Sequence, residues 1–306
     1  MKTTIRKLAL PVIVLCLMVF TAACGSSGST SDGSKPKVKI GSKNFTEQFI
    51  LGELYAQALE ANKYPVERKL NLGGTNVAFE ALKNGDIDLY PEYTGTALYD
   101  VLKEEAANDA QAVYDAVKTG YKKNWNIELL NQTPFNNTYV LVTTKEIADK
   151  HGLKTLSDLS TKAPELEFAL IPEFEDRPDG LPGLRRVYGG FEFKSAKLFD
   201  IGLKYKALTD KQVDVTIGFG TDGQIAGFEL VSLQDDKGLW PPYHAVPQIR
   251  GELLESHPEI GEIINKVNTL LTDEMMASLN WKVDGPDKEE PADVAKDFLK
   301  EQGLID

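Results

Sequence analysis

Hydrophobic and polar residues alternate along this chain in a pattern that predicts strands and helices in turn. Residues 37–41 alternate as a strand does, and apolar residues recur at helical spacing over residues 50–59. Residues 66–72 predict the next strand, and residues 75–84 predict a helix that Gly85 ends. A succession of strand, loop, helix and strand is typical of a parallel α/β sheet.

The same kind of pattern continues to the end of the chain. We expect further strands at 128–131, 138–143, 167–171 and 213–217, and helices at 111–122, 153–159, 259–271 and 291–300. Two shorter segments have other predicted roles. Residues 42–47 are expected to form a loop in which Asn44 and Glu47 have the spacing of a capping box. Residues 230–233 are expected to lead the chain back toward its first half.

Two segments of the chain resemble each other at an offset of 126 residues. Residues 81–90 and 207–216 share an Ala-Leu pair, a polar turn and an apolar run that opens with Ile or Val before Asp. The same offset places Tyr93 opposite Phe219, each in a loop that carries Gly and Thr. Ligands of open α/β sheets bind beyond the carboxyl ends of strands. Two similar lobes are therefore expected to present aromatic rings to a cleft, whereas Tyr90 is expected to point elsewhere.

The order of the predicted elements indicates that the chain passes between the two lobes twice. Residues 36–133 and 237–306 are expected to form one lobe, and residues 134–236 the other. Two crossings make a hinge, which suits a cleft that closes on a ligand.

The N-terminus has the features of a secretory signal. A basic start and a short apolar run over residues 8–20 are followed by Ala-Ala and Cys24. We expect a signal peptide at 1–23, lipid modification of Cys24 and a Gly/Ser-rich tether at 24–35; simple secretion is the alternative. Removal of the signal moves the formal charge from −12 to −15, because three basic residues leave with it.

Composition excludes several classes of chemistry. Cys24 is the only cysteine left after processing, so no internal disulfide, Cys-based metal site or internal thiol nucleophile is expected. The three His residues lack metal-ligand spacing, and neither a GxSxG elbow nor a P-loop occurs. A strongly acidic chain also argues against nucleic acid. We predict no enzyme activity, no cofactor and no metal, and expect Glu92 and Glu173 to be surface or capping carboxylates.

Charged and polar residues add candidates to the aromatic pair. Lys43 and Arg177 follow the first strand of each lobe, from which both side chains can converge on one anion. Thr96 and Asn137 can add neutral hydrogen bonds, although turn and capping roles remain open for them.

Two further aromatic residues, Tyr139 and Tyr243, lie close to the two crossings, where hinge packing is the alternative role. A quaternary ammonium has no N–H to donate, so aromatic faces suit its charge, at about 0.5–2 kcal/mol for each desolvated ring. A carboxylate elsewhere on the ligand then pairs with the two cations. Glycine betaine and carnitine carry both a quaternary ammonium and a carboxylate, whereas choline carries the quaternary ammonium and a hydroxyl.

Several motifs resemble those of the osmoprotectant-binding lipoproteins of ABC importers, the family that binds glycine betaine, carnitine and choline. The motifs are Gly41-Ser-Lys-Asn-Phe-Thr-Glu-Gln48, Tyr90-Pro-Glu-Tyr-Thr-Gly-Thr96, Phe135-Asn-Asn-Thr-Tyr139, Arg177-x-Asp-Gly-Leu-Pro-Gly183, Thr221-Asp-Gly223 and Pro241-Pro-Tyr243. The resemblance spans almost the whole chain after the tether and implies a type II periplasmic-binding-protein fold.

The resemblance also implies roles for the candidate residues. It implies that Tyr93, Tyr139, Phe219 and Tyr243 form an aromatic cage for the ligand cation. It also implies that Lys43, Thr96 and Arg177 bind the carboxylate of the ligand, and that Asn137 lies near the cage. Relatives more often have Tyr at the position of Phe219, and choline-specific relatives have Asp at that of Thr96. The resemblance therefore favours broad specificity that includes betaines.

The function implied is capture of quaternary ammonium osmoprotectants for an importer. The expected partners are a membrane permease and a separate ATPase subunit, and the protein is expected to be a monomer, lipid-anchored on the outer face of the bacterial plasma membrane. A binding protein for another small polar solute, such as an amino acid, is the runner-up. An extracytoplasmic hydrolase and a structural adhesion lipoprotein are the remaining alternatives.

Overall fold

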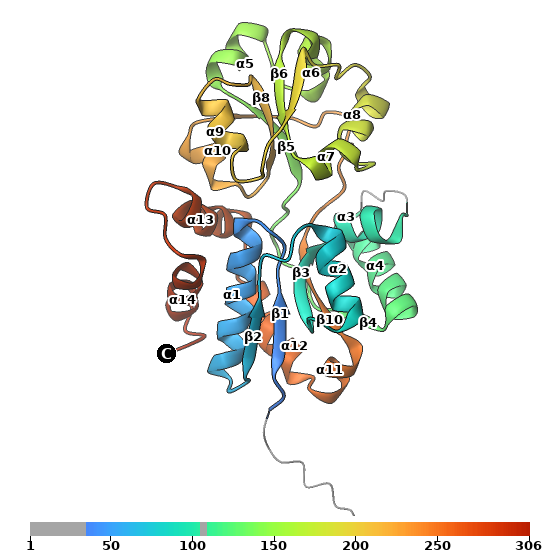
Figure 1. Ribbon diagram of the computed structural model, residues 1–306, viewed down its shortest axis with the longest axis vertical. Helices are drawn as coiled ribbons and strands as arrows, with labels where there is room; N and C mark the ends of the chain where they lie inside the picture. The colour runs from blue at the N-terminus through green and yellow to red at the C-terminus, as the bar shows by residue number, and fades with distance from the viewer. Residues whose placement is uncertain (1–34, 105–108) are drawn as a thin grey trace, which may run out of the picture. The chain divides into compact units, whose positions relative to one another are not determined.

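The computed structural model describes residues 35–104 and 109–306. The predicted signal peptide, Cys24 and nearly all of the tether lie outside the described residues. The described chain folds into two five-stranded mixed sheets with helices around them, which confirms the α/β class and the expected pair of lobes (Figure 1).

The first sheet has the strand order β2-β1-β3-β10-β4. Its β1 is parallel to β2 and β3, whereas β10 is antiparallel to both of its neighbours. The strands are β1 (Val38–Gly41), β2 (Val66–Lys69), β3 (Leu89–Tyr93), β4 (Ile127–Leu129) and β10 (Ala245–Arg250).

The second sheet repeats this arrangement with the order β7-β6-β8-β5-β9. Here β6 is parallel to β7 and β8, and β5 is antiparallel to β8 and β9. The strands are β5 (Tyr139–Thr143), β6 (Glu167–Leu170), β7 (Ser195–Leu198), β8 (Val215–Phe219) and β9 (Val231–Leu233).

The internal repeat seen in the sequence corresponds to the middle strand of each sheet. Both ends of β3 and β8 differ by the predicted 126 residues, and each is the third strand of its sheet. Tyr93 and Phe219 are therefore the last residues of equivalent strands, at the carboxyl edge where a ligand is expected.

Helices cover both faces of the first sheet. Leu89 and Tyr90 are neighbours on β3, yet they belong to different hydrophobic clusters, because successive strand residues face opposite sides. Tyr90 packs with residues of α2 and α4, away from Tyr93, as predicted. Helices α13 and α14 pack against α1 (Figure 1).

The helices follow in chain order. They are α1 (Thr46–Ala61), α2 (Thr75–Asn84), α3 (Thr94–Thr96), α4 (Ala110–Trp125), α5 (Lys145–His151), α6 (Leu156–Lys162), α7 (Pro172–Asp176), α8 (Leu181–Tyr188), α9 (Lys204–Thr209), α10 (Gly223–Gly227), α11 (Gly251–Ser256), α12 (Glu259–Asn268), α13 (Asp273–Asp284) and α14 (Pro291–Glu301). A π-helical turn covers Ala97–Leu102, and a 3₁₀ turn covers Ala163–Glu165.

Two segments that connect the sheets run side by side. Asn136 and His244 form an antiparallel bridge, and the backbone N–H of Asn137 donates to the Tyr243 carbonyl at 3.1 Å. The Tyr243 N–H in turn donates to Oδ1 of Asn136 at 2.7 Å. Asn137 and Tyr243 are therefore held by the paired connections. The lobe boundaries at 133/134 and 236/237 stay a prediction.

Two local predictions were wrong. Helix α1 begins at Thr46, with Phe45 as its N-cap residue and no side-chain cap, so Asn44 and Glu47 do not form a capping box. Residues 231–233 form the edge strand β9 of the second sheet and do not lead back to the first. Strand β10 was not predicted. The end of α2 at Gly85 is confirmed, since Gly85 has the left-handed conformation with φ 78° that glycine adopts without strain.

Candidate functional site

The structure brings all eight predicted ligand-binding residues to the wall of one cavity. We call this the cage cavity. Its walls come from both sheets and from the two connections between them. The lining residues are Lys43, Phe45, Tyr93, Thr96, Asn137, Tyr139, Glu173, Arg177, Ile201, Phe219 and Tyr243.

The second sheet and the returning connection supply three neighbouring rings. Tyr139 on β5 pairs in register with Phe219 on β8, which leaves their ring centroids 5.5 Å apart. The Tyr243 ring meets the Tyr139 ring edge-on, at 5.8 Å and 66°. Three rings from three separate segments thus form a continuous aromatic wall.

Phe45 is an aromatic member of this site that the sequence interpretation missed. Its ring stacks on Tyr93 at 6.2 Å and on Phe219 at 5.9 Å, with interplanar angles of 21° and 9°. Phe45 therefore bridges the two rings that the internal repeat had paired. Its place two residues after Lys43, in the exit loop of β1, is the signal that would have indicated it.

Burial keeps the tyrosines of the cage cavity neutral. Desolvation is the largest cause that raises the pKa of Tyr93, Tyr139 and Tyr243 well above the usual range. Each phenol therefore retains its proton, and the hydroxyls of Tyr93 and Tyr243 both donate to carboxylates, Glu47 at 2.7 Å and Asp179 respectively.

Lys43 has a carboxylate partner inside the protein. Its Nζ lies 2.6 Å from Oε1 of Glu92 and 3.3 Å from Oγ1 of Thr75. Glu92 is fully buried on β3, so the expectation that it is a surface or capping carboxylate was wrong. The reason is that Glu92 compensates a buried ammonium. By contrast Glu173 is exposed, and its Oε1 accepts from the N–H of Thr75 at the start of α2, as a capping carboxylate does.

Arg177 is paired in the same way. Its Nε and Nη2 donate to the two oxygens of Asp179 at 2.8 and 2.6 Å. Nη1 makes a longer contact, 3.4 Å, with Oγ1 of Thr96. The guanidinium carbon lies 5.6 Å from the Tyr139 ring centroid. Arg177 therefore contacts the ring wall and the predicted hydrogen-bonding threonine together.

Glu47 is a second functional candidate that the sequence interpretation missed. Its buried carboxylate accepts from the hydroxyls of Tyr93 at 2.7 Å and of Thr221, and from the amides of Asn137 at 2.8 Å and Asn280 at 3.1 Å. Burial raises its pKa above the ordinary 4.5, against the opposing effect of these hydrogen bonds. No Lys, Arg or His of the described chain forms an ion pair with it. Glu47 thus joins the end of β3, the connection that carries Asn137 and the loop after β8 through neutral donors.

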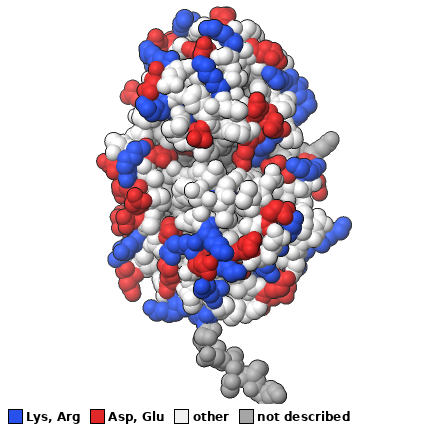
Figure 2. Space-filling model, viewed as in Figure 1, with Lys and Arg blue, Asp and Glu red and all other residues white. Residues whose placement is uncertain are grey.

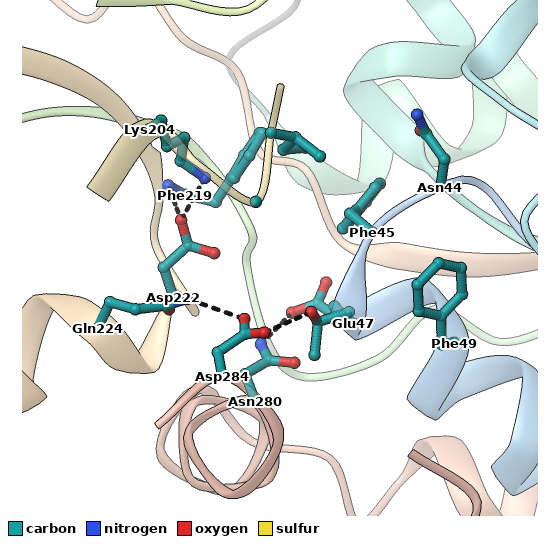
Figure 3. Close-up of a pocket in the computed structure, with 13 residues that line it drawn as sticks. Asn44, Phe45, Glu47, Phe49, Lys204, Phe219, Asp222, Gln224, Asn280 and Asp284 are labelled. Atoms are coloured by element: carbon teal, nitrogen blue, oxygen red, sulfur yellow. Dashed lines mark hydrogen bonds and ion pairs between the residues drawn. The ribbon is translucent and has the colours of Figure 1, made fainter. Parts of the chain in front are cut away.

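A second cavity adjoins the cage cavity. Phe45, Ile201 and Phe219 line both cavities. Figure 3 shows it between the Phe45–Phe219 rings and the polar side chains of Glu47, Asp222 and Asp284.

Comparison with known proteins agrees with this geometry. The family model described as the substrate binding domain of ABC-type glycine betaine transport systems, OpuAC, matches residues 36–301. The chain belongs to this family. Membership of the OpuAC family makes it a substrate-binding protein of ABC import, which acts on the extracytoplasmic side of the membrane, and not an enzyme.

Individual relatives extend the comparison. The chain is 37% identical over 271 residues to the ergothioneine transport permease/ergothioneine binding protein EgtU of Helicobacter pylori strain G27, and the match covers 88% of this chain and 48% of that protein. The chain thus spans about half of EgtU. It is 35% identical over 298 residues to the carnitine transport binding protein OpuCC of Listeria monocytogenes serotype 1/2a, covering 96% of both.

A solved structure shows the same fold. It is described as a crystal structure of a glycine betaine/carnitine/choline ABC transporter, with a TM-score of 0.73 and 35% sequence identity. The likeness covers 88% of this chain and all of the other. The expected periplasmic-binding-protein fold is confirmed.

Over residues 35–104 and 109–306, no group of three His, Cys, Asp or Glu side chains has a metal-binding arrangement. None of the helices in that part of the chain is both long and apolar enough to span a bilayer. On the face shown in Figure 2, acidic and basic side chains are interspersed, without the continuous basic stripe that a phosphate backbone requires.

Proposed function

We propose that the protein captures trimethylammonium compounds, with glycine betaine and carnitine as the leading ligands and choline as a further one. The observation that carries this is the cage cavity, where Tyr93, Tyr139, Phe219 and Tyr243 from both sheets and a connection line one space. A methylated nitrogen has no proton to share, so ring faces suit it better than carboxylates do.

The ring energies are of the right size for such a site. Each desolvated ring contributes about 0.5–2 kcal/mol to cation binding. Three or four rings together approach the roughly 8 kcal/mol of a micromolar complex. Phe45 adds a fifth ring to the four expected.

We assign the carboxylate of a betaine to the other end of the cage cavity, at Thr96 and Arg177. Arg177 keeps Nη1 turned to Thr96 while its other donors bind Asp179. Lys43 and Asn137 line the same space, although the Asn137 Nδ2 already donates to Glu47. Because Glu92 and Asp179 already neutralise the two cations, we expect the ligand carboxylate to be held chiefly by directed hydrogen bonds.

Calorimetric titration tests the proposal. The protein is first unfolded and refolded to remove any bound ligand. The ligands are glycine betaine, carnitine, choline and ergothioneine, with dimethylglycine and glycine as matched compounds that bear N–H groups. Saturable binding of the methylated compounds and loss of affinity toward glycine are expected. A preference for glycine would favour an amino-acid-binding protein, and no binding of any methylated ligand would remove the proposal.

We also propose that a lipid on Cys24 anchors the protein, as a monomer, to the outer face of the plasma membrane. The OpuAC family and the sequence of the N-terminus support this, since an importer needs its binding protein close to the permease and its separate ATPase. Cys24→Ser should release the protein into the medium, whereas the wild type should stay with the membrane fraction. Release of both would mean simple secretion. Light scattering of the processed protein tests the monomer.

A further inference from the structure

Lys204 is a buried cation to which the proposed function gives no role. It is 3% exposed at the start of α9, and its Nζ lies 4.4 Å from the centroid of the Phe219 ring. An aromatic ring attracts an ammonium at this distance. The protein itself therefore places a cation on one of the rings that line the cage cavity.

Lys204 contacts Phe219 from outside the cage cavity. Phe219 lines both cavities, whereas Lys204 lines the second cavity and not the cage cavity (Figure 3). A ligand cation in the cage cavity therefore shares the Phe219 ring with the ammonium of Lys204. Two like charges repel each other more strongly in a buried site than in water, so this ring attracts the ligand cation less than a ring without an ammonium does.

Asp222 holds Lys204 and Phe219 in this arrangement. Its Oδ2 lies 2.9 Å from Nζ of Lys204 and accepts from the backbone N–H of Phe219 at 3.0 Å. The same oxygen accepts from the hydroxyl of Tyr205 at 2.7 Å. These bonds fix the ammonium relative to the end of β8, which carries the ring. They also neutralise part of its charge.

The first sheet has the same arrangement, built from other residues. Nζ of Lys43 lies 4.8 Å from the Tyr93 ring centroid, and Oε1 of Glu92 binds both this ammonium and the Tyr93 N–H, at 2.6 and 2.8 Å. Oε2 of Glu92 accepts from the hydroxyl of Tyr90 at 3.1 Å. Glu92 comes directly before its ring residue and Asp222 three residues after, so the internal repeat of the sequence does not contain this match. The ring at the end of each middle strand thus has its own ammonium and its own carboxylate.

We propose that Lys204 is a specificity-determining residue, which weakens the attraction of Phe219 for a ligand cation to an extent that Asp222 limits. The ammonium opposes the ligand cation on the shared ring, and the carboxylate reduces this opposition. The pair therefore sets how strongly the cage cavity prefers a cation to a neutral group of the same shape. The inference rests on the proposed function and concerns the strength of that preference.

The experiment compares choline with its neutral carbon analogue, in which a quaternary carbon replaces the nitrogen. The two compounds have the same shape, so the ratio of their affinities in calorimetric and competition titrations reports the electrostatics of the cage cavity. Lys204→Met removes the ammonium and should tighten choline at least about threefold while the neutral analogue stays within about twofold. Lys206→Met, on the exposed side of the same helix, removes a charge that solvent screens and should change neither.

Asp222→Asn is a second variant with the opposite expected sign. The amide keeps an oxygen for the Phe219 N–H but leaves Lys204 without its counter-charge, so choline should weaken about threefold or more and the neutral analogue should not. Equal changes for the two compounds in either variant, or choline affinities that move in the same direction in both, would overturn the inference. Wild-type protein that binds neither choline nor glycine betaine would instead overturn the proposed function.

Discussion

Tyr139 and Phe219 lie opposite each other on the antiparallel strands β5 and β8, with ring centroids 5.5 Å apart and planes at 31°. The strand register fixes this pair, because opposite residues of neighbouring strands project to the same face of the sheet. The second sheet therefore presents two rings as one unit, at the edge where its middle strand ends.

Removal of one ring tests the cation-binding role of this wall. Tyr139→Ala should weaken glycine betaine and choline alike by about 1–3 kcal/mol, or about 5- to 150-fold, since both carry the methylated nitrogen. Titration calorimetry measures both affinities. Tyr139→Phe is the matched control, because it keeps the ring and should cost much less. Unchanged affinity in the Ala variant would place the ligand away from Tyr139.

The sequence predicted this aromatic wall because each of its residues lies in a short segment with a recognisable pattern of its own. The repeat of 126 residues marked the ends of β3 and β8, and with them Tyr93 and Phe219. The motifs around Tyr139 and Tyr243 supplied the rest through a family resemblance. Site residues on a single strand or in its exit loop can therefore be inferred from the amino-acid sequence alone.

Long-range contacts could not be predicted in the same way. The partners of Glu47 include Thr221 and Asn280, which are 174 and 233 residues away, so local spacing suggested only a helix cap. Strand β10 was missed for a different reason. It contains Pro247, and proline argues against a central strand, yet Pro247 lies opposite Pro91 within the sheet.

Arg177 and Asp179 form a buried ion pair, so variants of the pair distinguish the effect of Arg177 on ligand binding from its effect on protein stability. Loss of Arg177 alone would leave Asp179, which is 1% exposed, without its cation, at a cost of about 3–5 kcal/mol in the free energy of unfolding. The double variant Arg177→Met, Asp179→Asn removes both charges. It should weaken glycine betaine at least about tenfold and choline less than about threefold, because only the betaine brings a carboxylate.

Competition titration against a fluorescent readout of the cage aromatics measures both affinities on the double variant. Thermal unfolding of the single and double variants provides the control for folding. Equal weakening of the two ligands would show that Arg177 serves only to hold Asp179 and, through it, the Tyr243 hydroxyl.

Thr96 provides a test of ligand choice. Its hydroxyl lies 3.4 Å from Nη1 of Arg177, so a carboxylate in its place would take that donor and repel the carboxylate of a betaine. Thr96→Asp should lower the affinity for glycine betaine about tenfold or more and leave choline equal or tighter. Thr96→Val, which has the same shape without the hydroxyl, is the control and should lower betaine binding only modestly. A parallel loss for both ligands in Thr96→Asp would contradict the assignment.

The burial of Glu47 predicts a pH dependence of stability. Desolvation raises its pKa above 4.5, so between 4.5 and the raised pKa the folded protein binds more protons than the unfolded chain. The contribution of Glu47 to the free energy of unfolding is therefore fully present below 4.5 and is lost as the pH rises through the folded-state pKa.

Urea unfolding of the ligand-free protein from pH 5 to pH 8 measures this contribution. The free energy of unfolding of the wild type, relative to Glu47→Gln, should fall as the pH rises, because the amide does not titrate. Glu301→Gln, at the exposed end of α14, is the matched control and should show a nearly constant difference. A wild-type advantage that grows with pH would mean that the four donors around Glu47 outweigh its desolvation, which would reverse the assigned direction of the pKa shift.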